Sequence, residues 1–105
     1  MKITTRHADG VTTISLAGEL DMSTAPGLQE QVTAAATTTP THTLVIDATQ
    51  LEFCDSAGIR ALVLTRDDAT RHGMAFRLTN TRGITRRTLQ ITGVLDALTG
   101  TPADR

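Results

Sequence analysis

The chain has 105 residues and 39% hydrophobic content, which suits a single domain with one compact core. Its net charge of −1 and its lack of Trp and Tyr argue against a nucleic-acid-binding surface, which needs positive charge and stacking platforms. A single cysteine excludes an internal disulfide, and no apolar run approaches the roughly 20 residues that span a bilayer, so we expect a cytoplasmic protein without direct membrane insertion.

The N-terminal part of the chain is predicted to form a β-hairpin. Residues 2–7 and 11–17 each alternate between apolar and polar side chains, and the Asp-Gly pair at 9–10 is a strong signal for a tight turn. In the second strand, Ile14 and Leu16 fall on the face that we expect to point toward the core.

A connection over residues 18–22 and then a helix are predicted after the hairpin. Ser23 or Thr24 can cap this helix, and Pro26 is tolerated in the first turn because N–H groups there have no helical partner. The helix should end around Thr37. The residues predicted to form its buried stripe are Leu28, Val32 and Ala35 or Ala36.

The middle of the chain is predicted to carry a strand followed by a helix. Leu44, Val45 and Ile46 form an aliphatic run that fits a strand buried on both faces. We expect residues 47–53 to form a short turn and Asp55 to cap the helix. The residues predicted on the buried side of this helix are Ile59, Leu62 and Val63. Those predicted on its exposed side are Arg60, Leu64, Asp67 and Arg71.

The C-terminal third is predicted to add one strand and one helix. Gly73 is a natural stop for the middle helix, and residues 74–79 have the pattern of a strand. A last helix is marked by Ile84, Thr88 and Ile91 and is ended by Gly93. Residues 100–105 are expected to form a flexible tail. The apolar residues expected to anchor the segment before the tail are Val94, Leu95 and Leu98.

The element order β-β-α-β-α-β-α predicts a single α/β domain over residues 1–99. Its sheet would be mixed but mostly parallel, with an N-terminal hairpin and with helices packed against it, because each strand–helix–strand unit joins parallel strands. Functional loops of such sheets lie at the C-terminal ends of the parallel strands. The loop over residues 19–21 and the turn before Ser56 both follow such strands, so we expect them to be neighbours.

Ser56 lies in the first turn of the middle helix, directly after the capping Asp55. Backbone N–H groups without helical partners and the positive end of the helix dipole point outward there, and both would favour a phosphate on the hydroxyl. A simpler alternative is that Asp55 and Ser56 only start a helix. The acids that would form a rim around Ser56, or would remain solvated loop residues, are Glu19, Asp21, Glu52 and Asp55.

The other reactive residues form no pattern for catalysis or metal binding. No base is placed to activate Ser56 as a nucleophile, and Cys54 is expected to be a small buried hydrophobic residue. His7, His42 and His72 lie on separate predicted elements without metal-ligand spacing. We therefore expect neither an enzyme nor a protein that binds a metal or a cofactor.

Four short motifs occur in an order that resembles a known family. The motif Asp55-Ser56-Ala57-Gly58 follows residues 51–54 (LEFC), and Gly18-Glu19-Leu20-Asp21 follows the second predicted strand. A helix beginning near Pro26 and the segment at 91–94 (ITGV) complete the layout. Over residues 3–98 the chain resembles STAS domains, and more narrowly the stand-alone anti-sigma factor antagonists of bacteria. Arg far outnumbers the lone Lys2, and Ala and Thr are abundant. This composition is typical of a GC-rich bacterial source.

The resemblance implies a regulatory binding module rather than an enzyme. Unphosphorylated, it would bind and sequester an anti-sigma factor and so free a sigma factor for transcription. The same anti-sigma factor would be a serine kinase that phosphorylates Ser56 and breaks the complex, and a separate serine phosphatase would reset it. Ala57 replaces a frequent Ser or Thr of the family, so Ser56 is the only local acceptor. The residues expected to bind the partner are Asp21, Asp55, Ser56, Ala57, Gly58, Arg60 and Leu64.

A second hypothesis keeps the fold and changes the task. The chain would then be a STAS subunit of a membrane transport complex or a scaffold in a stress-signalling assembly. Such a protein would purify together with an ATPase or a large particle, and Ser56 could remain unmodified.

Overall fold

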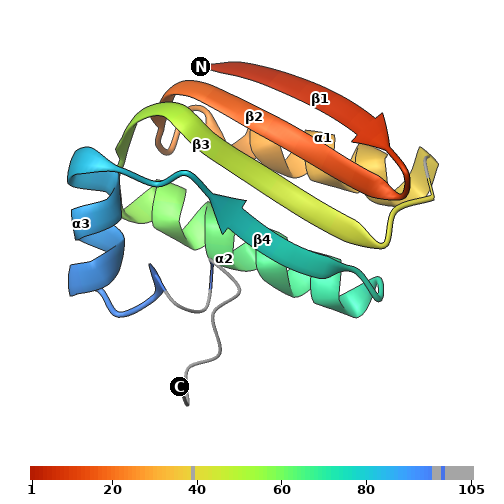
Figure 1. Ribbon diagram of the computed structural model, residues 1–105. Coiled ribbons are helices and arrows are strands. Elements are labelled where there is room, and N and C mark those ends of the chain that lie inside the picture. The colour runs from red at the N-terminus through yellow and green to blue at the C-terminus, as the bar shows by residue number, and fades with distance from the viewer. Residues whose placement is uncertain (39, 96–97, 99–105) are drawn as a thin grey trace.

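The computed structural model describes residues 1–38, 40–95 and 98, which form a four-stranded sheet and its helices (Figure 1). The elements in chain order are β1 (Lys2–Ala8), β2 (Val11–Leu20), α1 (Ala25–Thr38), β3 (Thr43–Cys54), α2 (Ser56–Arg71), β4 (Ala75–Thr79) and α3 (Gly83–Ile91). This is the α/β order predicted from the sequence. The tail predicted at 100–105 lies outside the described residues.

The strands lie side by side in the order β1-β2-β3-β4. β1 pairs antiparallel with β2, whereas β2, β3 and β4 run parallel to one another, as the two strand–helix–strand units require. The hairpin turn is as predicted: Asp9 and Gly10 have φ of 54° and 78°, and positive φ at both positions is typical of a two-residue type I′ turn.

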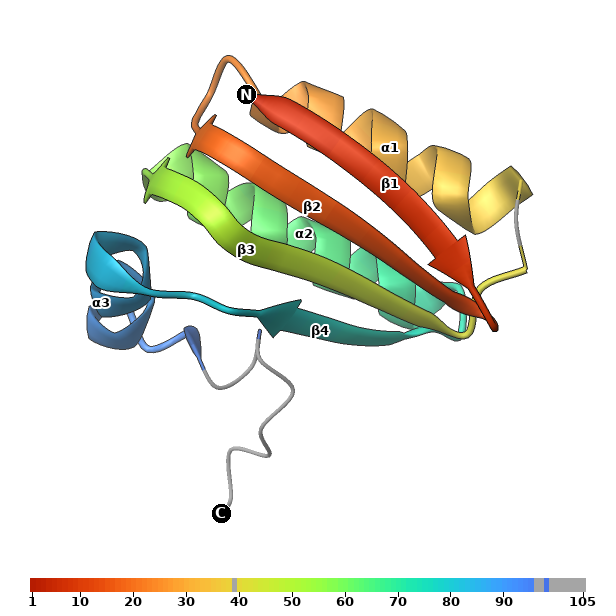
Figure 2. The same cartoon turned by 45° about the horizontal axis from the view of Figure 1, so that its top comes forward.

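The two longer helices, α1 and α2, cover the same face of the sheet, and Figure 2 looks onto the other face. Leu44 and Ile46 of β3 point toward the helices and are 0% exposed, whereas Val45 between them is half-buried. The prediction that this strand is buried on both faces is therefore wrong, because no described helix covers the second face.

β3 is longer than predicted, because residues 47–53 continue the strand instead of forming a turn. Its ladder with β2 shifts register between Ser15 and Ala17 and again between Gly18 and Glu19. Such bulges interrupt the alternation of buried and exposed side chains, so the segment looks like a polar turn in the sequence. The connection predicted over residues 18–22 also begins late, since β2 continues to Leu20.

α1 buries the predicted stripe, and its start is organised differently from the prediction. Leu28, Val32 and Ala35 are all buried against the core. Thr24 precedes the helix, but its hydroxyl donates to the Glu19 carbonyl (2.9 Å) and accepts from the Asp21 N–H (2.9 Å). These bonds tie the helix start back to the end of β2 rather than capping the first turn.

Both ends of α2 match the prediction. The Asp55 carboxylate accepts a hydrogen bond from the Gly58 N–H at 2.8 Å, so Asp55 is the N-cap. Gly73 ends the helix with φ of 76°, and the N–H groups of Gly73 and Met74 donate to the carbonyls of Thr70 and Ala69. This pattern is a Schellman motif, which satisfies the last carbonyls of the helix.

The buried side of α2 includes the predicted residues but is centred on smaller side chains next to them. Leu62 is fully buried, but Ile59 and Val63 are only partly buried. The buried residues of α2 are Gly58, Ala61, Leu62, Thr65 and Ala69. Small side chains let the helix lie close to the sheet. A pattern of hydrophobic residues alone does not identify such small residues as buried. The predicted outer side is confirmed, because Arg60, Leu64, Asp67 and Arg71 are all exposed.

α3 forms where it was predicted, but the isoleucines that mark it in the sequence do not lie on its buried side. Ile84 and Ile91 are 63% and 74% exposed, and the residues buried instead are Thr85 and Leu89. Beyond the helix, Gly93 has φ of 80°, and Leu95 and Leu98 are buried in the core as expected.

Gly58 is the point at which α2 touches the end of β2. A Cβ atom at this position would collide with the carbonyl of Leu20 and would lie 2.7 Å from the sulfur of Cys54. Gly27 is the third residue of α1, as Gly58 is of α2. The atom nearest to a Cβ added at Gly27 would belong to Ile3 and would lie 3.7 Å away.

Gly58→Ala should destabilise the fold by about 1–3 kcal/mol, because the backbone of α2 must move away from β2. The matched control Gly27→Ala should be neutral or stabilising by up to about 1 kcal/mol, because Ala is the better helix former. Urea unfolding of both variants measures the difference. Equal effects at the two positions would contradict the tight contact.

Asp55→Ala should cost about 1 kcal/mol of unfolding free energy through the lost cap, whereas Asp55→Asn should cost only a few tenths. The same urea titration distinguishes the two variants. If Asp55→Asn were as destabilising as Asp55→Ala, the carboxylate charge rather than the cap bond would be responsible.

Candidate functional site

The end of β2 and the start of α2 are neighbours, as predicted from the topology. Leu20 and Cys54 are paired in the parallel ladder, and the Asp55 N–H donates to the Leu20 carbonyl at 3.3 Å. In Figure 1 both strands end at the same edge of the sheet. The loop before α1 and the first turn of α2 therefore form one continuous surface.

Ser56 is the first residue of α2, and its side chain is exposed. The Asp55 carboxylate binds the N–H of Gly58, and the Asp55 carbonyl accepts from the Ile59 N–H at 2.9 Å. Within the described part of the chain, no side chain or carbonyl is hydrogen-bonded to the Ser56 hydroxyl. An accessible alcohol at a helix N-terminus can therefore accept a phosphate without losing an existing bond.

The Asp21 side chain forms its hydrogen bonds within the loop between β2 and α1. Its carboxylate accepts hydrogen bonds from the hydroxyl and the N–H of Ser23 (2.7 and 2.9 Å) and from the N–H of Thr24 (3.2 Å). The hydroxyl bond from Ser23, with these backbone bonds, lowers the pKa of Asp21 below its ordinary value. Asp21 therefore stays ionised at neutral pH and fixes the path of the chain from β2 into α1.

The predicted acidic rim divides into two kinds of residue. The Asp21 carboxylate accepts hydrogen bonds within its loop, and the Asp55 carboxylate accepts one at the helix cap. Glu19 and Glu52 are exposed. The two glutamates are thus the exposed members of the rim, whereas Asp21 and Asp55 are half-buried.

A groove of about 520 Å³ lies between α1 and α2, next to Ser56. Three of the predicted partner-binding residues, Ala57, Arg60 and Leu64, line its α2 side, and Leu64 is 41% exposed. The residues that line the opposite side are Met22, Ala25, Pro26, Gln29 and Glu30.

Sequence reasoning missed the α1 side of this groove. Met22 is 79% exposed, the most exposed large hydrophobic residue of the described chain. It falls within the connection predicted over residues 18–22, and an apolar residue directly before a helix and next to the Ser56 turn is the available signal.

Two residues close to Ser56, Cys54 and Gly58, are buried. Gly58 is buried under the Leu20 carbonyl. Cys54 is 4% exposed, and burial, with the nearby Asp55 charge, raises the pKa of its thiol to about 12. The prediction of a small buried hydrophobic residue at position 54 is confirmed, and its thiol is protonated at neutral pH.

The described residues contain no cluster of His, Cys, Asp and Glu that could hold a metal ion. His7 and His42 bond to threonine hydroxyls, and the ring of His72 bonds to the Asp68 carbonyl. In the described chain, no helix has the length and apolarity needed to cross a membrane.

Residues 2–103 match the family model of the STAS domain. The chain is 30% identical to the anti-sigma-F factor antagonist RsfB of Mycobacterium tuberculosis, over 98% of this chain and 91% of RsfB. Its structure resembles that of an anti-sigma factor antagonist from Mycobacterium paratuberculosis, with a TM-score of 0.78, 33% identity and coverage of 93% and 81% of the two chains.

The fold also matches the anti-sigma factor antagonist SpoIIAA in its unphosphorylated form, with a TM-score of 0.79, 19% identity and coverage of 93% and 85%. The phosphorylated form of the Bacillus SpoIIAA matches with a TM-score of 0.72 at 19% identity, over 93% of this chain and 88% of that one. The chain belongs to the STAS-domain family and, within it, to the anti-sigma factor antagonists.

Proposed function

We propose that this protein sequesters an anti-sigma factor through the groove between α1 and α2, and that phosphorylation of Ser56 releases it. The observation that carries this proposal is the exposed hydroxyl of Ser56 at the N-terminus of α2, directly beside Ala57 in the groove wall. The anti-sigma factor would itself be the serine kinase, and a separate serine phosphatase would restore the hydroxyl.

The groove has the composition of a small protein-binding surface. Met22 and Leu64 offer exposed apolar side chains, and Arg60 and Glu30 supply charges at the rim. An apolar centre with a polar rim is the usual anatomy of such an interface. Of the seven residues expected to bind the partner, four would make contact and three would hold the surface in shape. The contacting residues would be Ser56, Ala57, Arg60 and Leu64, and the supporting residues would be Asp21, Asp55 and Gly58.

A phosphate on Ser56 would weaken the binding of a docked partner that places a negative charge nearby. It brings about −1.5 to −2 charges at neutral pH. One unit charge facing a like charge at ~6 Å, with an effective dielectric constant near 20, costs roughly 3 kcal/mol, or about 100-fold in affinity. The fold itself should tolerate the anion, because the N-terminus of α2 favours negative charge. Charge conflict at the interface, rather than refolding, would then be the switch.

The relatives support this proposal. RsfB is an anti-sigma-F factor antagonist, and SpoIIAA has been solved both with and without its phosphate. In this chain Ala57 stands next to Ser56, so no second hydroxyl competes for the phosphoryl group within the first turn of α2. Incubation with candidate anti-sigma factor kinases and ATP, followed by peptide mapping, tests the site. A phosphate on another residue would overturn the assignment.

Ser56→Asp should weaken binding of the anti-sigma factor by more than tenfold, because it places a negative charge at the interface, and should leave the thermal midpoint close to wild type. The matched control Ser56→Ala should remain folded and bind without release by ATP. Calorimetric titration of each variant with the purified anti-sigma factor gives the affinities. Loss of binding in Ser56→Ala would contradict the interface.

Leu64→Ser should reduce partner affinity by about tenfold or more, because an apolar anchor of the groove is lost. Ile84→Ser on α3 is the matched control, since Ile84 is an even more exposed aliphatic residue outside the groove. Its affinity should equal that of wild type. The reverse result would move the docking surface to α3.

Purification with an ATPase or a large particle instead of an anti-sigma factor would favour a transport or scaffold role.

A further inference from the structure

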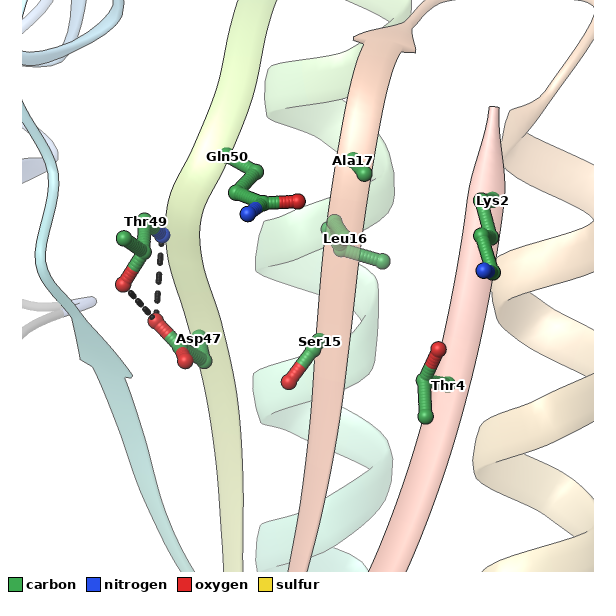
Figure 3. Close-up of a pocket in the computed structure, with 8 residues that line it drawn as sticks. All are labelled: Lys2, Thr4, Ser15, Leu16, Ala17, Asp47, Thr49 and Gln50. Carbon is green, nitrogen blue, oxygen red and sulfur yellow. Dashed lines mark hydrogen bonds between the residues drawn. The ribbon is translucent and has the colours of Figure 1, made fainter.

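The face of the sheet opposite α1 and α2 carries a hollow of about 330 Å³ (Figure 3). Its walls come from β1 on one side and β3 on the other, and β2 forms its floor. The polar residues that line it are Lys2, Thr4, Ser15, Asp47, Thr49 and Gln50. This volume is at the lower end of the range for ligand sites, so it suits a small molecule.

The hollow arises from small side chains and a bulge. Ser15 and Ala17 leave the floor low between longer side chains on the neighbouring strands. The register shift between Ser15 and Ala17 turns two consecutive residues of β3, Thr49 and Gln50, outward, where a regular strand would expose only one. The bulge thus adds a polar side chain to the wall.

Several polar groups in this hollow have no partner among the described residues. The side chains of Lys2, Thr4, Ser15 and Gln50 make no hydrogen bond with any described part of the chain. Ser15 is half-buried, so its unpaired hydroxyl is only partly accessible to bulk water. These groups can donate to, or accept from, a bound molecule.

Asp47 supplies a fixed negative charge to the β3 wall. Its Oδ1 accepts from the N–H and the hydroxyl of Thr49 and from the side-chain amide of Asn80. The bond from Asn80, followed by those from Thr49, lowers the pKa of Asp47, so the carboxylate is ionised at neutral pH. All three bonds end on Oδ1, and Oδ2 accepts none from the described residues.

We propose that this hollow binds a small zwitterion of the amino-acid class, with its carboxylate facing Lys2 and Thr4 and its ammonium group facing Asp47. Opposite charges on opposite walls disfavour a simple anion, which Asp47 repels, and a simple cation, which Lys2 repels. The lining has no aromatic ring on which a base could stack and only one cation, so it is poorly suited to a nucleotide.

This site is independent of the proposed switch. The hollow lies on the face of the sheet that no described helix covers, whereas the Ser56 groove lies between α1 and α2, which cover the other face (Figure 2). Failure of one proposal therefore leaves the other intact, and chemical-shift changes distinguish them by the face on which they occur.

Titration of the ¹⁵N-labelled protein with glycine, L-serine and L-glutamine tests the proposal. At least one of these amino acids should bind with a dissociation constant below about 10 mM and shift the amide signals of Ser15, Ala17 and Gln50. Acetate and methylammonium, which carry one charge each, should bind at least fivefold more weakly. Absence of binding, equal binding of the single ions, or shifts confined to the α1–α2 groove would overturn the proposal.

Two variants test the charges separately. Asp47→Asn keeps the Oδ1 acceptor for Thr49 and Asn80 but removes the charge, and Lys2→Gln changes an exposed side chain. Each should weaken binding of the best amino acid by about fivefold, as expected for one solvated charge contact. Arg77→Gln, an exposed cation of β4 outside the hollow, is the control and should bind as wild type. Unchanged affinity in Lys2→Gln would overturn the proposal even if Asp47→Asn were unstable.

Discussion

The contact between the first turn of α2 and the end of β2 determines where the site lies. Gly58 has no side chain because the Leu20 carbonyl occupies the space that a Cβ would need, and Asp55 donates its N–H to the same carbonyl. The cap bond, which the Gly58 N–H donates to the Asp55 carboxylate, then fixes the helix start on the strand end. Ser56 is therefore presented from a rigid support. Under the proposed function, a charge added to Ser56 would act on the docked partner, because these contacts hold the turn in place.

Topology was predictable from the sequence because its signals are local and strong. The Asp-Gly turn at 9–10, the cap at Asp55 and the stop at Gly73 each depend on backbone chemistry within a few residues. The rule that parallel strands present their C-terminal ends at one edge then brought the loop at 19–21 next to Ser56. The Ser56 side of the site could accordingly be predicted without coordinates.

Side-chain facing was less predictable, since it depends on tertiary contacts. Ile84 and Ile91 of α3 are exposed while Thr85 and Leu89 are buried, because the short helix meets the sheet through only a small part of its surface. The length of β3 was not predictable for a different reason. Two register shifts interrupt the alternation of buried and exposed side chains within residues 47–53. The α1 wall of the groove, with Met22, required knowledge of how two helices far apart in sequence lie together.

Cys54 stands immediately before the DSAG segment, and its thiol is buried with a pKa of about 12. Peroxides attack the thiolate form, which is scarce at such a site, and an oxidised sulfur would need room that the Gly58 backbone already occupies. The chain thus carries its one cysteine beside Ser56 with its thiol buried and protonated, a form that reacts slowly with oxidants. Under the proposed function, oxidation of Cys54 would therefore not interfere with a phosphate on Ser56.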